Sequence, residues 1–107
     1  VLALDMFTYI LAKYVMGMAV ACGGDVDALV FTAGIGENSP LIRSRTCNLV
    51  SKMLKVELDE TKNIASTSAD FCAGLISPNG YKPVVAVIPT DEEAMICDEC
   101  IRLTSLC

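Results

Sequence analysis

The chain has 107 residues, of which 53% are hydrophobic, and a formal net charge of −5. This length fits one modest domain, in which folding buries roughly 60 to 70% of the surface that the unfolded chain exposes. The acidic balance, without any cluster of Lys and Arg, argues against a nucleic-acid partner, because phosphate binding needs such clusters. The apolar share is above the usual value, so we expect apolar surface that a missing portion of the protein or a partner subunit covers.

The first predicted helix lies in the apolar run from Leu2 to Cys22. Gly23 and Gly24 are typical of a helix C-cap, so the helix should end near Cys22. Because Asp5 and Lys13 interrupt the run, we interpret it as a buried helix and expect no membrane partner. The run also lacks the features of a signal peptide, which favours a cytoplasmic protein. Its apolar residues recur at helical spacing, at Leu4, Phe7, Leu11, Tyr14, Val15 and Met18.

A buried strand, a Gly-rich turn and a second long helix are predicted next. The strand spans Val26 to Thr32. Ser39 and Pro40 are typical of an N-cap followed by proline at the first helical position. We expect Arg43 and Arg45 on the solvated surface of the helix that follows. Its apolar face would consist of Ile42, Leu49, Val50, Met53 and Leu54.

The second half of the chain predicts a strand between weaker segments. From Val56 to Tyr81 the pattern favours one or two short strands, with a turn at Ser77-Pro-Asn-Gly80. A buried strand is predicted over Val84 to Ile88, because branched residues dominate it and Pro89 ends it.

A final helix should follow this strand and run to about Leu103. Thr90 and Glu93 have the spacing of a capping box, with Thr90 as the cap and Glu93 folding back to it. Ile96, Cys100 and Leu103 would then share one face of the helix. The alternation of helices and strands along the chain predicts an α/β layer structure.

The chain contains six cysteines, which we expect to be reduced thiols of a cytosolic protein that serve mainly in packing. Cys97 and Cys100 form a C-x-x-C pair. One such pair without His or a second pair cannot complete a tetrahedral zinc site. A thiol-based redox role of these two residues remains a minor alternative.

The two strongest strands each lead into a helix through a polar turn, where ligands of α/β proteins collect. If the strands are parallel, both turns lie at one edge of the sheet. Gly34 and Gly36 would allow unusual dihedral angles and let a ligand approach the backbone. The helix start at Ser39 would offer free N–H groups to a phosphate, a ribose hydroxyl or a base edge. On spacing alone, a tight turn whose glycines serve geometry is an equal alternative, because Gly-x-Gly matches neither the Walker nor the Rossmann pattern.

The stretch Phe31-Thr-Ala-Gly-Ile-Gly-Glu-Asn-Ser39 closely resembles the signature loop of the acetate kinase family, within the sugar kinase, Hsp70 and actin superfamily. Asp27-Ala-Leu-Val30 before it, Ile42-Arg43 after it and Val87-Ile-Pro-Thr-Asp-Glu-Glu93 are similar to the pattern of the same family, in the same order. The resemblance implies that residues 1–107 are the C-terminal portion of the family's C-terminal domain. The expected fold is part of a ribonuclease H-like (actin-like ATPase) α/β domain, with a short sheet flanked by helices. A start at Val1 rather than Met fits an excised segment.

The activity that this resemblance implies is reversible phosphoryl transfer between ATP and acetate, giving acetyl phosphate and ADP, with Mg²⁺. Gly34, Ile35, Gly36, Glu37 and Asn38 would line the adenosine pocket. Ile35 would contact the base, and Asn38 would act as a donor and acceptor. For the Glu37 side chain, a direct ligand role and a local interaction with the helix dipole are equally open.

Glu92 matches the position of a magnesium-associated carboxylate in the family, and Mg²⁺ prefers such hard oxygen ligands. Its alternative is a first-turn acid that stabilises a helix. The chain contains no His, and the catalytic Arg, His and Asp residues of the family have no counterpart in it. We therefore expect the segment alone to be inactive, with no catalytic residue of its own.

The partners implied are a nucleotide, a short-chain carboxylate and, in the intact enzyme, a second subunit in a homodimer. Propionate kinase is the nearest alternative activity, because the residues that select the acyl chain would lie outside this segment. A nucleotide-binding or dimerisation module without catalysis is the alternative of a different class.

Overall fold

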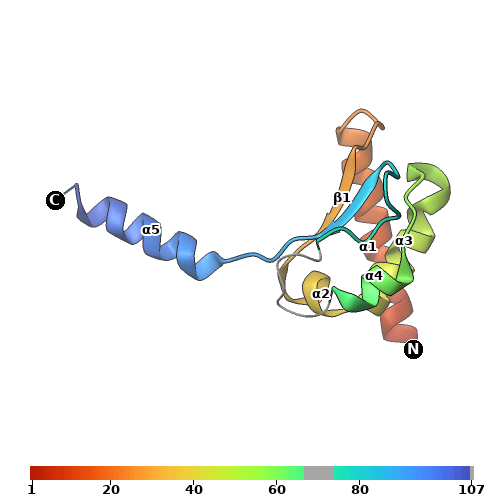
Figure 1. Ribbon diagram of the computed structural model, residues 1–107, viewed down its shortest axis with the longest axis horizontal. Coiled ribbons are helices and arrows are strands. Elements are labelled where there is room, and N and C mark those ends of the chain that lie inside the picture. Colours follow the sequence, from red (N-terminus) through yellow and green to blue (C-terminus); the bar gives the residue numbers. More distant parts are fainter. Residues whose placement is uncertain (67–73, 107) are drawn as a thin grey trace.

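The computed structural model describes residues 1–66 and 74–106. Figure 1 shows a body built around two strands, from which the last helix projects at the end of an extended connection. This arrangement confirms the α/β class. The elements are α1 (Leu2–Ala21), β1 (Ala28–Phe31), α2 (Ala33–Asn38), α3 (Pro40–Leu54), α4 (Glu60–Ala65), β2 (Val84–Val87) and α5 (Glu92–Thr104).

Strands β1 and β2 pair in parallel, from Ala28 opposite Val84 to Phe31 opposite Val87. The Ile88 N–H donates to the Phe31 carbonyl at 2.9 Å, which continues the pairing one residue beyond β2. Both strands therefore end at the same edge of the sheet, as a parallel arrangement requires. The turns that follow them begin side by side.

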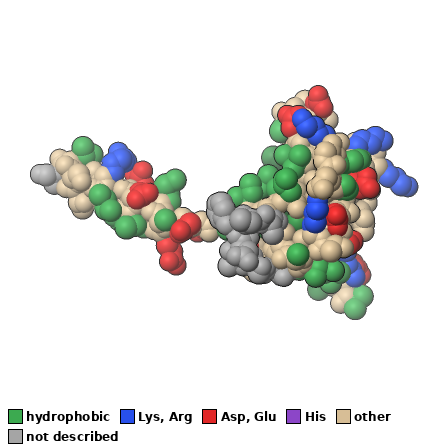
Figure 2. All heavy atoms as spheres, viewed as in Figure 1, with side chains coloured by type: hydrophobic (Ala, Val, Ile, Leu, Met, Phe, Trp, Pro, Cys, Tyr) green, Lys and Arg blue, Asp and Glu red, His purple; other side chains and the backbone are tan. Residues whose placement is uncertain are grey.

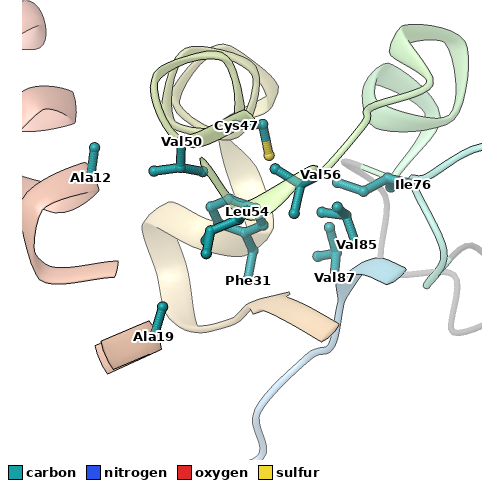
Figure 3. Packing of buried hydrophobic residues seen from close by; sticks show 10 residues of the cluster. All are labelled: Ala12, Ala19, Phe31, Cys47, Val50, Leu54, Val56, Ile76, Val85 and Val87. Carbon is teal, nitrogen blue, oxygen red and sulfur yellow. The ribbon is translucent and has the colours of Figure 1, made fainter. Parts of the chain in front are cut away.

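The hydrophobic core lies between the sheet and α3 (Figure 3). Phe31 from β1 and Val85 and Val87 from β2 lie in one buried cluster with residues of α3 and of the loops beside it. The face of α3 differs from the predicted one, because Leu49 and Met53 are exposed. The buried residues of α3 are Arg43, Thr46, Cys47, Val50 and Leu54.

Helix α1 packs against α3 through small residues. Thr8, Ala12 and Ala19 are its buried positions, whereas Phe7 and Tyr14 are exposed. The prediction of a buried helix is therefore wrong for the described part of the chain. The buried side chains of α1 are short, which lets the helix approach α3, whereas most of its large apolar side chains are exposed. By length and composition alone, α1 is long and apolar enough to cross a membrane, a test that core helices of other proteins also pass.

Helix α1 ends as its glycines predict. Gly23 and Gly24 both have φ of 82°, and the Gly24 N–H donates to the Ala19 carbonyl at 2.8 Å. Backbone of this left-handed kind favours glycine, so the chain turns here towards β1.

Arg43 is completely buried, contrary to the expected place on the helix surface. Its Nε and Nη2 donate to the side-chain and main-chain oxygens of Asn63 in α4, at 2.7 and 2.6 Å. Its Nη1 donates to the carbonyls of Gly36 and Glu37 at the end of α2, at 2.8 and 2.9 Å. Burial lowers the pKa of the Arg43 guanidinium from its ordinary value. One side chain thus joins three helices, because a guanidinium carries five donors in a fixed fork.

Helix α4 lies where the sequence predicts weak strands. Asp59 caps it by accepting from the N–H groups of Thr61 and Lys62. In the described residues, strand structure in this region is limited to an isolated antiparallel bridge between Leu75 and Ala86. Residues 67–73, over which the strand prediction also extends, lie outside the described residues. The predicted turn at residues 77–80 is confirmed by the bond from the Tyr81 N–H to the Pro78 carbonyl at 3.1 Å.

Every described residue of α5 is exposed. Ile96, Cys100 and Leu103 share a face as predicted by spacing, but that face meets no other described element closely enough to be buried. Figure 2 shows hydrophobic and acidic side chains along the viewed side of this helix. The apolar surface expected from composition is therefore present on α5 as well as on α1.

We predict that Arg43→Met lowers the free energy of unfolding by about 3 kcal/mol, because buried acceptors on Gly36, Glu37 and Asn63 lose their donor. Chemical denaturation followed by circular dichroism measures the change. Arg45→Met is the matched control. Arg45 forms an exposed ion pair with Asp5, so this variant should lose less than about 1 kcal/mol. Equal losses in the two variants would contradict a structural role for Arg43.

We also predict that Cys47 resists alkylation by iodoacetamide at pH 8 while Cys22, Cys97 and Cys100 react. Cys47 is 2% exposed, and desolvation, with a smaller effect of the Glu60 charge, raises the pKa of its thiol to about 12. Among the described cysteines, Cys22, Cys97 and Cys100 are free and exposed. Because the thiolate is the nucleophile, Cys47 should react only in denaturant. Peptide mass spectrometry reads the labelling, and equal native labelling of Cys47 would refute the prediction.

Candidate functional site

An open pocket of about 480 Å³ lies at the edge of the sheet where both strands end. One side of it is formed by Ala33, Gly34 and Glu37 of α2, and the other by residues 90–93 of the turn into α5. The structure therefore brings Gly34, Glu37 and Glu92 together. Ile35, Gly36 and Asn38 do not line this pocket, although they belong to the same short helix.

The expected Gly-rich turn is folded as helix α2. Its entry is made by Thr32 in extended conformation and by Ala33, which has φ of 61°. A left-handed alanine costs about 1 to 2 kcal/mol, and such strain clusters at functional sites. The unusual dihedral thus falls on Ala33, whereas neither Gly34 nor Gly36 has a positive φ.

Gly34 and Gly36 serve different purposes in α2. A Cβ added to Gly34 would meet nothing within 4 Å, so its backbone is open to the pocket. A Cβ on Gly36 would lie 3.3 Å from the carbonyl carbon of Phe31, which is closer than ordinary packing allows. Gly36 therefore lets α2 fold back on the end of β1.

Ile35 and Asn38, two other residues of α2 predicted to bind the nucleotide, lie outside the pocket lining. Ile35 is 54% exposed and presents an apolar side chain to solvent. The Asn38 Nδ2 donates to the Gly34 carbonyl at 2.8 Å, so its amide supports α2 itself. Ser39 caps α3 by accepting from the Ile42 N–H at 3.4 Å, and Pro40 follows at the first helical position as predicted.

The Glu37 carboxylate links the two strand-end turns. Its Oε1 accepts from the Thr90 N–H at 2.9 Å and from the Thr90 hydroxyl at 3.3 Å. Sequence reasoning left this side chain open between a ligand and a helix dipole, and assigned Thr90 to the cap of α5. The bond joins residues 53 positions apart, so no local pattern could have revealed it.

Asp91, not Thr90, caps α5. The Asp91 Oδ1 accepts from the Ala94 N–H at 2.9 Å, and Glu92 and Glu93 occupy the first turn. The predicted capping box is therefore wrong by one residue, because Thr90 is bonded to Glu37 and Asp91 is the better placed acceptor. Glu92 lies at the positive end of the helix dipole, on the pocket side.

The chemistry of the pocket is that of hard oxygen donors. Four carboxylates, from Glu37, Asp91, Glu92 and Glu93, border it, and its lining contains no Lys or Arg. Within the described ranges, no group of three or more His, Cys, Asp or Glu is arranged to hold a metal ion. Carboxylates are hard oxygen donors of the kind that Mg²⁺ prefers, so these residues could hold such an ion only with further ligands from water or substrate.

Arg43 and Asn63 are structural residues of the site that sequence reasoning missed. Arg43 holds the Gly36 and Glu37 carbonyls near the end of α2. One signal was available in the sequence. Arg43 precedes Cys47, Val50 and Leu54 by four, seven and eleven positions, the spacing of the buried helix face.

Comparison with known proteins identifies the family. The family model described as the Acetokinase family matches residues 1–98, a range that contains all of α1. Acetate kinase 1 of Neisseria meningitidis serogroup A is 49% identical over 105 residues, which are 98% of this chain and 25% of that protein. Acetate kinase of Heliobacterium modesticaldum is 48% identical over 102 residues, with coverage of 95% and 24%.

Solved structures agree in fold. The acetate kinase of Porphyromonas gingivalis superposes with a TM-score of 0.78 at 36% identity, covering 96% of this chain and 25% of that one. A propionate kinase of Francisella tularensis gives 0.71 at 32% identity, with coverage of 89% and 22%. The chain spans about a quarter of the length of these relatives. From the family match over residues 1–98 and the shared fold, the chain belongs to the acetokinase family.

Proposed function

We propose that the chain supplies the nucleotide side and one magnesium-associated carboxylate of an acetate kinase. The intact enzyme would transfer a phosphoryl group reversibly between ATP and acetate, giving ADP and acetyl phosphate. The observation that carries the proposal is the shared pocket between α2 and the turn into α5, which unites Gly34 with Glu92. The two relatives compared by sequence, from Neisseria meningitidis and Heliobacterium modesticaldum, are named acetate kinases, which supports this activity over other uses of a nucleotide.

The nucleotide would bind along α2. Gly34 leaves its backbone uncovered, and an exposed Ile35 offers an apolar surface to the adenine ring. Gly36 and Glu37 would shape the adenosine pocket through their backbone, which Arg43 holds at both carbonyls. Asn38 would contribute its side-chain oxygen as an acceptor, since its Nδ2 is bonded to Gly34.

Glu92 would hold Mg²⁺, directly or through a water molecule. When bound, the ion would offset the negative charge of the phosphates. The exposed position of Glu92 in the first turn of α5 suits this role, because the carboxylate faces the pocket from a helix start. A purely structural contribution to the helix dipole would leave magnesium binding unaffected by its removal.

The transfer step needs groups that this segment does not contribute. Phosphoryl transfer depends on cationic stabilisation of the transferring group, but the chain has no His and the pocket lining has no cation. Arg43 is committed to four bonds in the interior. We therefore propose that the rest of the longer enzyme supplies these groups.

The exposed apolar faces of α1 and α5 support a larger assembly. We propose that they are covered by the remainder of the enzyme and by a second subunit in a homodimer, in the cytoplasm, without nucleic acid or membrane as partners. Helix α1 lies within the range that the family model matches, which supports interpreting it as part of this family's fold and not as a membrane span.

Propionate is the second candidate substrate. The structural similarity to a propionate kinase, with a TM-score of 0.71, supports propionate as an alternative substrate. The lining of the pocket contains no residue that would distinguish two short acyl chains. The choice rests on residues outside this segment.

A chimera tests the activity. Residues 1–107 replace the homologous quarter of Acetate kinase 1 of Neisseria meningitidis, with which they are 49% identical over 105 residues. We expect acetyl phosphate formation from ATP and acetate, measured as the hydroxamate, and about a 100-fold or greater loss in the Glu92→Ala chimera. Glu57→Ala removes an exposed carboxylate outside the pocket and should leave the rate unchanged. A folded but inactive chimera would contradict the proposal and favour a non-catalytic module.

Gly34→Ala separates the nucleotide role of α2 from its structural role. Because the added Cβ enters open space in a helix, the variant should gain up to about 1 kcal/mol in free energy of unfolding. It should nevertheless lose ATP affinity in the chimera, measured by calorimetry. Gly36→Ala is the comparison, since its Cβ crowds Phe31 and should cancel the gain in stability. Unchanged ATP affinity in Gly34→Ala would argue against a ligand at this backbone.

A further inference from the structure

We propose that Glu37 is a positioning residue that holds the turn into α5, and with it Glu92, at a fixed place opposite α2. The inference rests on the proposed function for the role of Glu92. The structural basis of the inference does not depend on the proposed function. It consists of the Glu37–Thr90 bond and the support at each end of that bond.

The Glu37 end of the bond is rigidly supported. Helix α2 ends on carbonyls that receive the Arg43 guanidinium, and Arg43 is itself fixed by Asn63 of α4. Gly36 lets the same helix lie against the end of β1, with a hypothetical Cβ only 3.3 Å from Phe31. The carboxylate of Glu37 therefore projects from a backbone that is held on two sides.

The Thr90 end has little other support from the described residues. The Ile88 N–H donates to the Phe31 carbonyl just after β2 ends. Between that bond and the start of α5, the described part of the chain has one further hydrogen-bonded link to the body, from Thr90 to Glu37. Residues 88–91 and all described residues of α5 are exposed. Without this bond, packing among the described residues would give the turn no fixed place relative to the body.

The position of Glu92 follows from the bond. Glu37 receives both the N–H and the hydroxyl of Thr90, which fixes the backbone two residues before Glu92. Asp91 then starts α5 by capping Ala94, so that Glu92 enters the first turn on the pocket side. Hydrogen bonds to a carboxylate are roughly twice as strong as neutral ones, which suits a connection that otherwise has few contacts.

The two possible roles of Glu37 predict different kinetics. A ligand of the nucleotide would change the KM for ATP when removed. A positioning residue acts through Glu92, so its loss should change the dependence on Mg²⁺ and kcat. Residues that orient metal ligands from outside typically contribute 10- to 100-fold to metal affinity or activity.

The test uses the chimera described above, with Glu37→Ala and the isosteric Glu37→Gln. In Glu37→Ala we expect the half-saturating Mg²⁺ concentration to rise about 10-fold and kcat to fall about 10-fold, with the KM for ATP changed less than about 2-fold. Glu37→Gln keeps an oxygen that accepts from the Thr90 N–H, so it should recover most of both losses. Glu57→Ala is the matched control for loss of an exposed carboxylate.

Hydrogen exchange supplies a readout that does not depend on activity. The Thr90 amide should exchange at least about 10-fold faster in Glu37→Ala than in the unsubstituted chimera, and near the unsubstituted rate in Glu37→Gln and Glu57→Ala. An unchanged Thr90 rate in Glu37→Ala would overturn the inference, as would a rise confined to the KM for ATP. If the unsubstituted chimera is inactive, the proposed function fails, but the exchange rates still decide whether Glu37 holds the turn.

Discussion

The buried guanidinium of Arg43 is the interaction on which the rest of the site depends. It lies in the interior of a small domain, where a charged group without partners would be strongly destabilising. Its four bonds remove that penalty and simultaneously join α2 and α4 to α3. A hydrophobic residue at this position would fill the space but leave the helix-end carbonyls of Gly36 and Glu37 without a donor.

This constraint reaches the pocket through the backbone of α2. A helix of six residues has little stability of its own, and this one also begins with a left-handed alanine. Tertiary bonds at its C-terminal end offset that strain. The same short helix then presents Gly34 to the pocket and Glu37 to Thr90, so the interior of the domain and the candidate ligand site share one element.

The fold is incomplete in its burial of apolar surface. Large side chains of α1 are exposed, and α5 extends away from the body with none of its described residues buried (Figures 1 and 2). These faces are consistent with a chain that spans about a quarter of its relatives. The pocket is incomplete in the same sense. It is open to solvent, and its lining contains carboxylates but none of the cations that phosphoryl transfer requires.

The sequence by itself determined the α/β class, the two strands, the ends of α1 and the cap of α3, although only β2 is largely buried while β1 buries Phe31 alone. It did so because hydrophobic period, glycine pairs and Ser-Pro caps are local signals that act within a few residues. It also predicted that both polar turns lie at one edge if the strands are parallel, and the structure shows this pairing. Only the tertiary structure decided that α2 is a helix, that Arg43 is buried, and that Thr90 bonds to Glu37 while Asp91 caps α5. The fold of α2, the burial of Arg43 and the Thr90–Glu37 bond depend on partners 6 to 53 positions away in the sequence. The cap of α5 depends on competition between two adjacent acceptors. Local spacing encodes neither the distant partners nor the outcome of this competition.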